Sequence, residues 1–98
     1  MAQEIFGKMT DNLFKAILEL KDVDECYKFF EDICTIKEIQ DVSQRLEVAR
    51  QLKNGSSYVE VAKDTGASTA TISRVNKCLS YGSGGYRLVL DRMDKENK

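Results

Sequence analysis

The feature that most constrains the fold of this chain is the spacing of small and apolar residues between positions 58 and 79. Ala62 offers a small side chain where two short helices could cross at a steep angle, and Gly66 follows four residues later. A turn between two such helices needs a positive φ, which glycine adopts without steric cost. Ile72 and Val75 stand where apolar side chains would fill the wedge between the helices. This spacing predicts a helix-turn-helix at 58–79.

The second helix of this motif is predicted to have two different faces. On a helical wheel of about 100° per residue, Val75 and Leu79 fall beside Ile72, so we expect this side to be buried. The opposite side is small and polar at its beginning and basic near its end, and Ser68 precedes it as an N-cap. A helix in the major groove of DNA needs such a face, because short side chains let its backbone approach the bases and cations meet phosphates. The alternative is an ordinary amphipathic helix with a solvated face.

The residues of this outward face form two groups, which we expect to contact different parts of a DNA duplex. Those expected nearest the base edges are Thr69, Ala70, Thr71 and Ser73. Those expected on phosphates are Ser68 and Lys77.

The composition favours an all-α fold. The chain has 98 residues, of which 42% are hydrophobic and none is proline, and this suits a single domain over residues 1–98. Apolar residues recur at helical spacing in about six segments. The predicted parts are a mobile arm at 1–9, helices at 11–20, 23–34 and 35–52, the helix-turn-helix at 58–79, a glycine-rich loop at 80–85 and a C-terminal helix at 86–94.

Two of the predicted helices begin with the pattern of a capping box, in which side chains satisfy N–H groups that lack an intrahelical partner. Thr35 and Glu38 form the first box, and Ser57 and Glu60 form the second. The predicted helices also present more apolar surface than a chain of this length covers alone. A symmetric homodimer with exchanged helices would cover it and place two recognition helices roughly 34–36 Å apart, about one DNA turn.

The charge of the chain is divided unevenly along its length. Residues 1–44 carry five Lys against ten Asp and Glu, a net charge of −5. Residues 45–79 carry six Lys and Arg against three acidic residues, a net charge of +3, and residues 80–98 carry a net charge of +1. The basic part coincides with the predicted helix-turn-helix, which suits DNA binding by one face although the whole chain has a net charge of −1.

Several classes of function are disfavoured. The chain lacks histidine, the commonest general base and metal ligand, and no two of Cys26, Cys34 and Cys78 have C-x-x-C spacing. We therefore expect no zinc site and no enzyme, and we interpret the cysteines as free, mostly buried thiols. No apolar run approaches the length of a membrane span and no signal peptide is evident, so we expect a cytoplasmic protein if the source is bacterial.

From Thr35 to Met93 the chain resembles the Trp repressor family, in particular its YerC/YecD-type branch. The resemblance rests on the long helix capped by Thr35, its stop at Asn54-Gly55, the segment Gly66-Ala-Ser-Thr-Ala-Thr-Ile-Ser-Arg74, and a loop followed by a final helix. It implies an intertwined all-helical homodimer that binds operator DNA and represses transcription.

The same resemblance implies an effector site. In that family two arginines and a threonine hold the corepressor tryptophan, and the matching residues here are Thr35, Arg45 and Arg74. Two departures argue against tryptophan: Val75 and Cys78 stand where the Trp repressor has glycine and serine, and the valine would occupy the space of the indole. The stretch between the stop glycine and the turn glycine is also one residue shorter. We expect that no cofactor is required, and leave open another small molecule or none.

Alternative interpretations remain for these residues and for the whole chain. Thr35 could simply cap a helix, and Arg45 could form a surface ion pair with Asp41. The helix-turn-helix could serve as a protein-interaction or assembly module without a duplex target. Recognition of RNA is disfavoured, because the A-form major groove is too narrow for this face.

Overall fold

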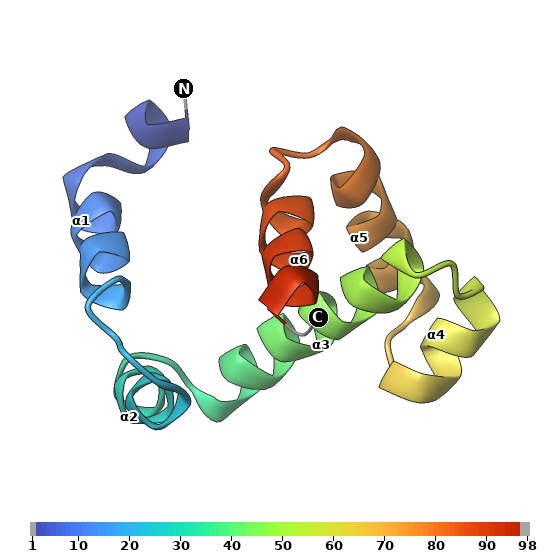
Figure 1. The fold of residues 1–98 in the computed structure, drawn as a ribbon, viewed down its shortest axis with the longest axis horizontal. Helices are drawn as coiled ribbons and strands as arrows, with labels where there is room; N and C mark the ends of the chain where they lie inside the picture. The colour runs from blue at the N-terminus through green and yellow to red at the C-terminus, as the bar shows by residue number, and fades with distance from the viewer. Residues whose placement is uncertain (1, 97–98) are drawn as a thin grey trace. The chain divides into compact units, whose positions relative to one another are not determined.

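The computed structural model describes residues 2–96, in which six α-helices and no strands occur. The all-α fold predicted from the sequence is therefore confirmed (Figure 1). The helices are α1 (Ala2–Ile17), α2 (Val23–Ile33), α3 (Ile36–Lys53), α4 (Tyr58–Thr65), α5 (Thr69–Tyr81) and α6 (Gly85–Glu96). None of them is both long enough and apolar enough to cross a membrane.

The chain divides into an N-terminal unit, Met1–Ile36, and a C-terminal unit, Lys37–Lys98. The N-terminal unit contains α1 and α2. Helix α1 begins at Ala2, within the segment predicted as an arm, and Gly7 interrupts it with a φ of 79°. This backbone conformation is open to glycine and strained for other residues. The mobility of the arm stays a prediction.

The N-terminal unit has no buried residue among its described side chains, 7–36. Helix α2 is well defined, because Asp22 caps it by accepting a hydrogen bond from the backbone N–H of Glu25 at 2.9 Å. Its apolar stripe nevertheless stays open, with Tyr27 62% exposed. Residues 7–36 thus form amphipathic helical segments without a buried core among their own side chains.

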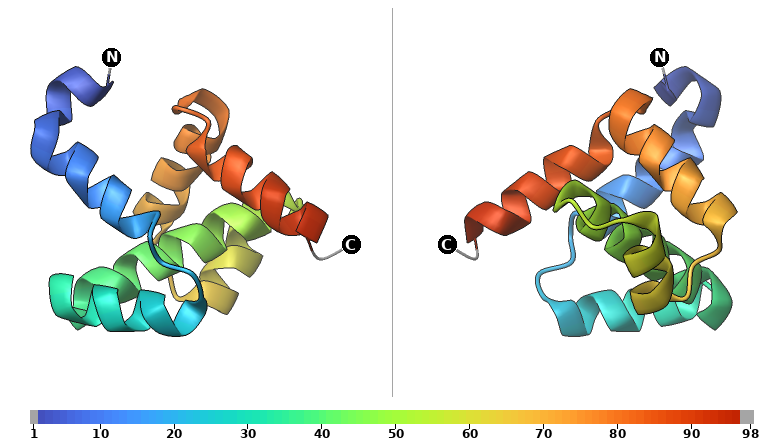
Figure 2. Two further views of the ribbon diagram at one scale, coloured as in Figure 1. Left: turned by 60° about the vertical axis from the view of Figure 1, so that its left-hand side comes forward. Right: turned by 90° about the vertical axis from the view of Figure 1, so that its right-hand side faces the viewer.

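The C-terminal unit builds the core of the chain. The buried residues come from α3, α4, α5, α6 and the turn between α4 and α5, and they form one cluster: Val48, Ala49, Val61, Ala67, Ile72, Val75, Leu79 and Leu90. Only the second half of α3 contributes to it, since Val42 in the first half remains 50% exposed. Helix α6 passes beside the C-terminal end of α3 in both views of Figure 2.

The predicted helix-turn-helix is present in α4 and α5. Ser57 and Glu60 form the expected capping box at the start of α4, and Gly66 ends this helix with a φ of 74°. Helix α5 then turns away from α4 (Figure 1). Ile72 and Val75 are each 1% exposed, so the wheel drawn from the sequence has the correct phase.

The end of α5 differs from the prediction. The helix continues to Tyr81, and α6 begins at Gly85, so the predicted loop at 80–85 shrinks to three residues. The N–H of Gly82 donates to the carbonyl of Cys78 at 2.9 Å and closes the last turn. Residues 80 and 81 are therefore helical, and only residues 82–84 connect α5 to α6.

The expected burial of the three cysteines is wrong for the single chain. All are free thiols, but Cys26 and Cys78 are exposed and Cys34 is only partly buried. Cys78 precedes the buried Leu79 on α5 and therefore faces outward. The small size and apolar character of cysteine favour burial on average, whereas the helical register decides it at each position.

Candidate nucleic-acid interface

The predicted DNA-facing residues lie on the side of α5 that its core contacts leave free. Ser68, Thr69, Ala70 and Lys77 are exposed, and Thr71 and Ser73 are partly buried. This side is uncharged where the helix begins and carries Lys77 two turns later. The structure therefore brings the six residues onto one accessible surface, and their contact with DNA stays a prediction.

The beginning of α5 is ordered by two hydroxyl groups. The Oγ of Ser68 accepts a hydrogen bond from the backbone N–H of Thr71 and donates one to its Oγ1, both at 3.1 Å. Helix α5 has no acidic residue in its first turn, so the partial positive charge of this helix end is not compensated. Such an end favours a phosphate oxygen.

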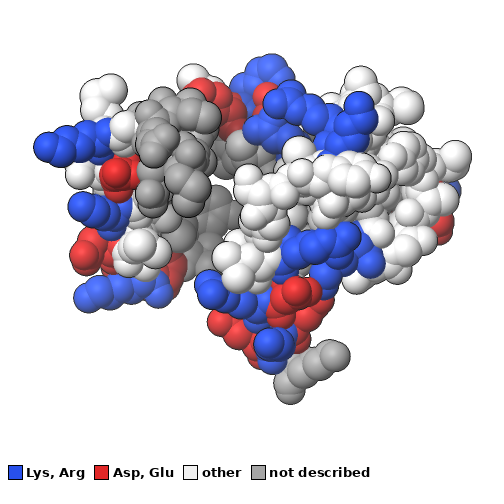
Figure 3. Space-filling model, turned by 90° about the horizontal axis from the view of Figure 1, so that it is seen from above, with Lys and Arg blue, Asp and Glu red and all other residues white. Residues whose placement is uncertain are grey.

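Charged side chains of both signs share the surface. In the space-filling view of Figure 3, Lys and Arg side chains form several separate groups, and Asp and Glu side chains lie beside some of them. No single large basic area is visible among the described residues in this view. Phosphate binding on such a surface would depend on individual Lys and Arg side chains more than on a large positive electrostatic potential.

A pocket adjoins this surface and joins α3 to α5. Its volume is about 180 Å³, and its lining residues are Asp41, Gln44, Arg45, Thr71 and Arg74. Arg45 is partly buried and Arg74 is exposed. The structure thus brings together the two arginines that the sequence suggested for an effector, while Thr35 belongs to the N-terminal unit and is not placed relative to them.

Two details bear on what the pocket could hold. Asp41 forms its ion pair with Lys37, at 3.3 Å, so the carboxylate offered as a structural partner for Arg45 is engaged elsewhere. Val75 points into the core, as its helical phase predicts, and does not line the pocket. Two guanidinium groups beside an open pocket can pair with a carboxylate or a phosphate.

Gln44 is a residue of this site that sequence reasoning missed. Its Nε2 donates to the backbone carbonyl of Thr65 at 3.1 Å and so ties α3 to the end of α4. The hydroxyl of Thr65 donates to the carbonyl of Val61 at 2.7 Å and accepts from the N–H of Ala67 at 3.2 Å. The only signal in the sequence is that a helix ending at Gly66 leaves carbonyls that need donors.

Arg87 is a second residue that sequence reasoning missed. Its Nε donates to the backbone carbonyl of Leu79 at 2.9 Å, across the short connection between α5 and α6. Helix α5 has no basic residue in its own last turn. Arg87 therefore supplies a cation at the negative end of α5, where such a charge is favourable.

Helix α6 is joined to α3 by ion pairs. The Nζ of Lys53 lies 2.7 Å from a carboxylate oxygen of Asp91 and 3.2 Å from one of Asp94. The hydrogen bonds that Lys53 donates to Asp91 and Asp94 raise the pKa of Lys53, and the bond to Asp91 lowers the pKa of that carboxyl group. The side chain of Lys53 is only 19% exposed, so this contact is more protected than an ordinary surface pair.

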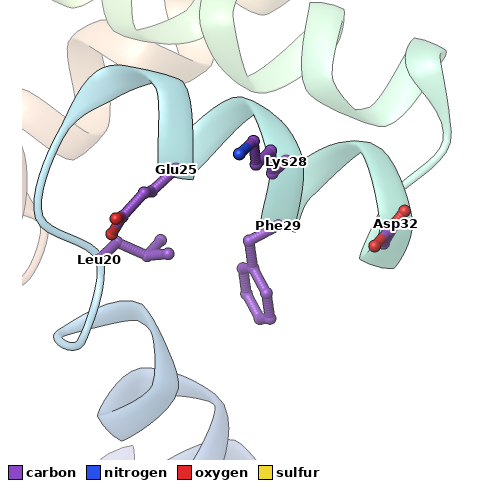
Figure 4. Close-up of a pocket in the computed structure, with 5 residues that line it drawn as sticks. All are labelled: Leu20, Glu25, Lys28, Phe29 and Asp32. Atoms are coloured by element: carbon purple, nitrogen blue, oxygen red, sulfur yellow. The ribbon is translucent and has the colours of Figure 1, made fainter.

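A second and larger pocket lies on the N-terminal unit, and none of its lining residues was singled out from the sequence as a site residue. It has a volume of about 290 Å³ and is lined by Leu20, Glu25, Lys28, Phe29 and Asp32. In Figure 4, Leu20, Glu25 and Phe29 project to the same side of α2. The Glu25 carboxylate accepts a hydrogen bond from the backbone N–H of Lys21 at 2.9 Å. The apolar part of the pocket lining consists of Leu20 and Phe29.

Comparisons with known proteins agree with this geometry. The model of the Trp repressor protein family matches residues 8–94. An uncharacterized protein of Bacillus subtilis (strain 168), YerC, is 59% identical over 87 residues, which are 89% of this chain and 84% of that protein.

Two crystal structures have the same fold. A TrpR like protein from Eubacterium eligens superposes with a TM-score of 0.89 at 52% identity, covering 94% of this chain and 95% of that one. A protein from Staphylococcus aureus superposes with a TM-score of 0.89 at 49% identity, covering 94% and 92%. The resemblance stated from residues 35–93 is confirmed, and it extends to nearly the whole chain.

Proposed function

The chain belongs to the Trp repressor protein family, and we propose that it is a sequence-specific, double-stranded DNA-binding regulator that represses transcription. The observation that carries the proposal is the division of α5 into two sides. Ile72, Val75 and Leu79 are buried against α3, α4 and α6, and this fixes which side is exposed. That exposed side has the short polar side chains that a major-groove helix needs. No enzymatic step is part of the proposal.

Within this proposal the residues of α5 take two roles. Thr69, Ala70, Thr71 and Ser73 lie nearest the bases, and Ser68 and Lys77 contact phosphates. These roles are supported by exposure at four of the six positions, namely Ser68, Thr69, Ala70 and Lys77. The Ser68–Thr71 hydrogen bonds hold the first turn in a fixed shape, so fewer side-chain rotations are lost when DNA binds.

The proposed regulator acts as a homodimer. Support comes from apolar surface that the single chain leaves open on several helices: Met9, Phe14, Leu18, Val23, Tyr27, Ile33, Ile36, Val42, Leu88, Val89 and Met93 are each at least 43% exposed. Association would remove such side chains from water, which is the main favourable contribution to most protein interfaces. A two-fold axis would present two copies of α5 to two half-sites about one DNA turn apart. In a bacterium such a protein would work in the cytoplasm, where the chromosome is.

No cofactor is required in this proposal, and we do not assign tryptophan as an effector. The pocket at Arg45 and Arg74 is proposed to accept a small carboxylate that modulates DNA binding. Its support is that two arginines, one from α3 and one from α5, line a pocket with a volume of about 180 Å³. The family resemblance gives Thr35, in the N-terminal unit, as a third candidate residue.

Selection of duplex DNA from a random library tests the function. The purified protein is used at near-physiological salt, with and without a pool of the twenty amino acids. Enrichment of a palindrome in both arms supports the proposal as stated. Enrichment only in the presence of the pool would establish an effector at the pocket, and failure of a folded protein to enrich any sequence would contradict DNA recognition.

A protein-interaction module is the second candidate, and the mixed charge of the surface favours it (Figure 3). Salt dependence separates the two. A regulator that touches several phosphates loses affinity steeply as salt rises, because bound counterions are released from the DNA. An interaction module would show no such slope on duplex DNA.

A further inference from the structure

Each of the two helices of the helix-turn-helix is held near its C-terminal end by a side chain from a neighbouring helix. Gln44 of α3 donates to the carbonyl of Thr65, the last residue of α4, at 3.1 Å. Arg87 of α6 donates to the carbonyl of Leu79, in the last turn of α5, at 2.9 Å. Both acceptors belong to the backbone, so both contacts constrain the path of the chain itself.

These two carbonyls are suited to such contacts because each lies in the last turn of its helix. The last carbonyls of a helix have no partner within it. The adjoining cap positions are already satisfied, since Gly66 N–H donates to Ala62 and Gly82 N–H donates to Cys78, each at 2.9 Å. A donor from another helix can therefore be added without replacing a helical hydrogen bond.

Helix α6 is itself fixed to α3. Lys53, with its side chain 19% exposed, pairs with Asp91 at 2.7 Å and Asp94 at 3.2 Å. Leu90 of the same helix is buried in the core. Helix α3 thus contacts α4 through Gln44, and the contact of Arg87 with α5 comes from α6, which is itself paired with α3. These polar contacts add to the core packing of α5 against α3.

We propose that Gln44 and Arg87 are positioning residues for DNA recognition, which set the direction of α5 relative to α3. This inference rests on the proposed function. In a dimer, the direction of each α5 decides the separation of the two recognition helices, and so the spacing of half-sites that the protein prefers. Fixing this direction with the protein's own side chains lowers the ordering cost of binding.

Gln44→Met and Arg87→Met test the inference, because methionine keeps most of the length of each side chain and removes the donor. Affinity is measured for the operator selected by the wild-type protein and for two versions with one base pair added or removed at the centre. Each substitution should weaken binding to the original operator about tenfold, the effect of losing one such hydrogen bond. The ratio of affinities between original and altered spacing should fall as well, since α5 can then adopt more directions.

Matched controls come from the same helices. Gln40→Met on α3 and Arg92→Met on α6 change exposed residues and should leave the spacing preference unaltered. Arg87→Lys keeps a cationic donor near the Leu79 carbonyl and should recover most of the preference. Circular dichroism and a melting curve verify that each variant is folded, and the three Arg87 and Arg92 variants suffice if Gln44→Met does not fold.

The outcomes separate the inference from the function on which it rests. A lower melting temperature with an unchanged spacing ratio in Arg87→Met would mean that the contact only stabilises the fold, and the positioning role would be wrong. The positioning role is supported if Arg87→Met loses the preference for the original half-site spacing and Arg87→Lys recovers it. If the wild-type protein selects no duplex sequence, the proposed function fails and the positioning role fails with it.

Discussion

The two units of this chain use the same amphipathic pattern with opposite results. In the C-terminal unit, α4, α5 and α6 bury their apolar sides in one cluster that leaves Ile72 1% exposed. In the N-terminal unit, α1 and α2 keep theirs open, with Phe14 56% and Tyr27 62% exposed. The comparison teaches that an apolar stripe predicts a helix and its apolar side, whereas it does not say what covers that side.

The largest expected effect is in the core of the C-terminal unit. Ile72→Asp would bury an unpaired carboxylate among α3, α4 and α5, which typically costs about 3–5 kcal/mol, and the helix-turn-helix should unfold. Val59→Asp on α4 is the matched control, because Val59 is 79% exposed. Circular dichroism melting curves measure both, and a normal curve for Ile72→Asp would show that this core does not hold the fold together.

The next effect belongs to the N-terminal unit. Phe14→Asp should leave the secondary structure of the single chain nearly intact, because Phe14 is 56% exposed there. In the proposed dimer it should weaken association by about 2 kcal/mol, the value of one buried aromatic side chain, or roughly thirtyfold in the dissociation constant. Sedimentation over a range of protein concentrations measures this, with Lys15→Ala as control. Unchanged association would show that α1 lies outside the interface.

A third test compares cations of the two units. Lys77→Ala on α5 should weaken binding to all DNA sequences and reduce the slope of log affinity against log salt by about 1. Lys28→Ala on α2 should leave that slope unchanged, because Lys28 lies outside the helix-turn-helix. Titrations at several salt concentrations measure both slopes. Equal slopes for Lys77→Ala and the wild type would remove this lysine from the DNA contacts.

The smallest expected effect is a pH dependence confined to the C-terminal unit. Hydrogen bonds from Arg50 and then Gln51 lower the pKa of Glu47 from 4.5 to about 2. Because the folded pKa lies below the unfolded one, this contribution is present above about pH 4.5 and is lost as the pH falls toward 2. The Arg50 and Glu47 side chains are 48% and 42% exposed, so solvent limits the effect to about 1 kcal/mol or less.

Denaturant unfolding between pH 5 and pH 2 measures this effect, since Glu47→Gln should flatten the pH profile of stability over that interval. Glu31→Gln changes a carboxylate of the N-terminal unit and should leave the unfolding of the C-terminal unit as it is. If the wild-type and Glu47→Gln profiles have the same shape, the ion pair with Arg50 contributes nothing measurable.

The helix-turn-helix could be predicted from the sequence because its signals are local. The capping box of Ser57 and Glu60, the turn at Gly66 and the cap at Ser68 each depend on residues three or four positions apart. The buried phase of α5 follows from helical periodicity alone. Local spacing placed Arg45 and Arg74 on their helices, whereas only the family resemblance suggested that they act together, and they line one pocket in the structure.

What only the tertiary structure decided are the contacts between residues far apart in the sequence. Gln44 reaches Thr65 across 21 positions, and Lys53 reaches Asp94 across 41. No periodicity encodes such pairs, because a long polar side chain can be satisfied by water as well as by a carbonyl or a carboxylate. Local spacing thus determined the helices and the exposed side of α5, and packing determined which side chains hold that side in place.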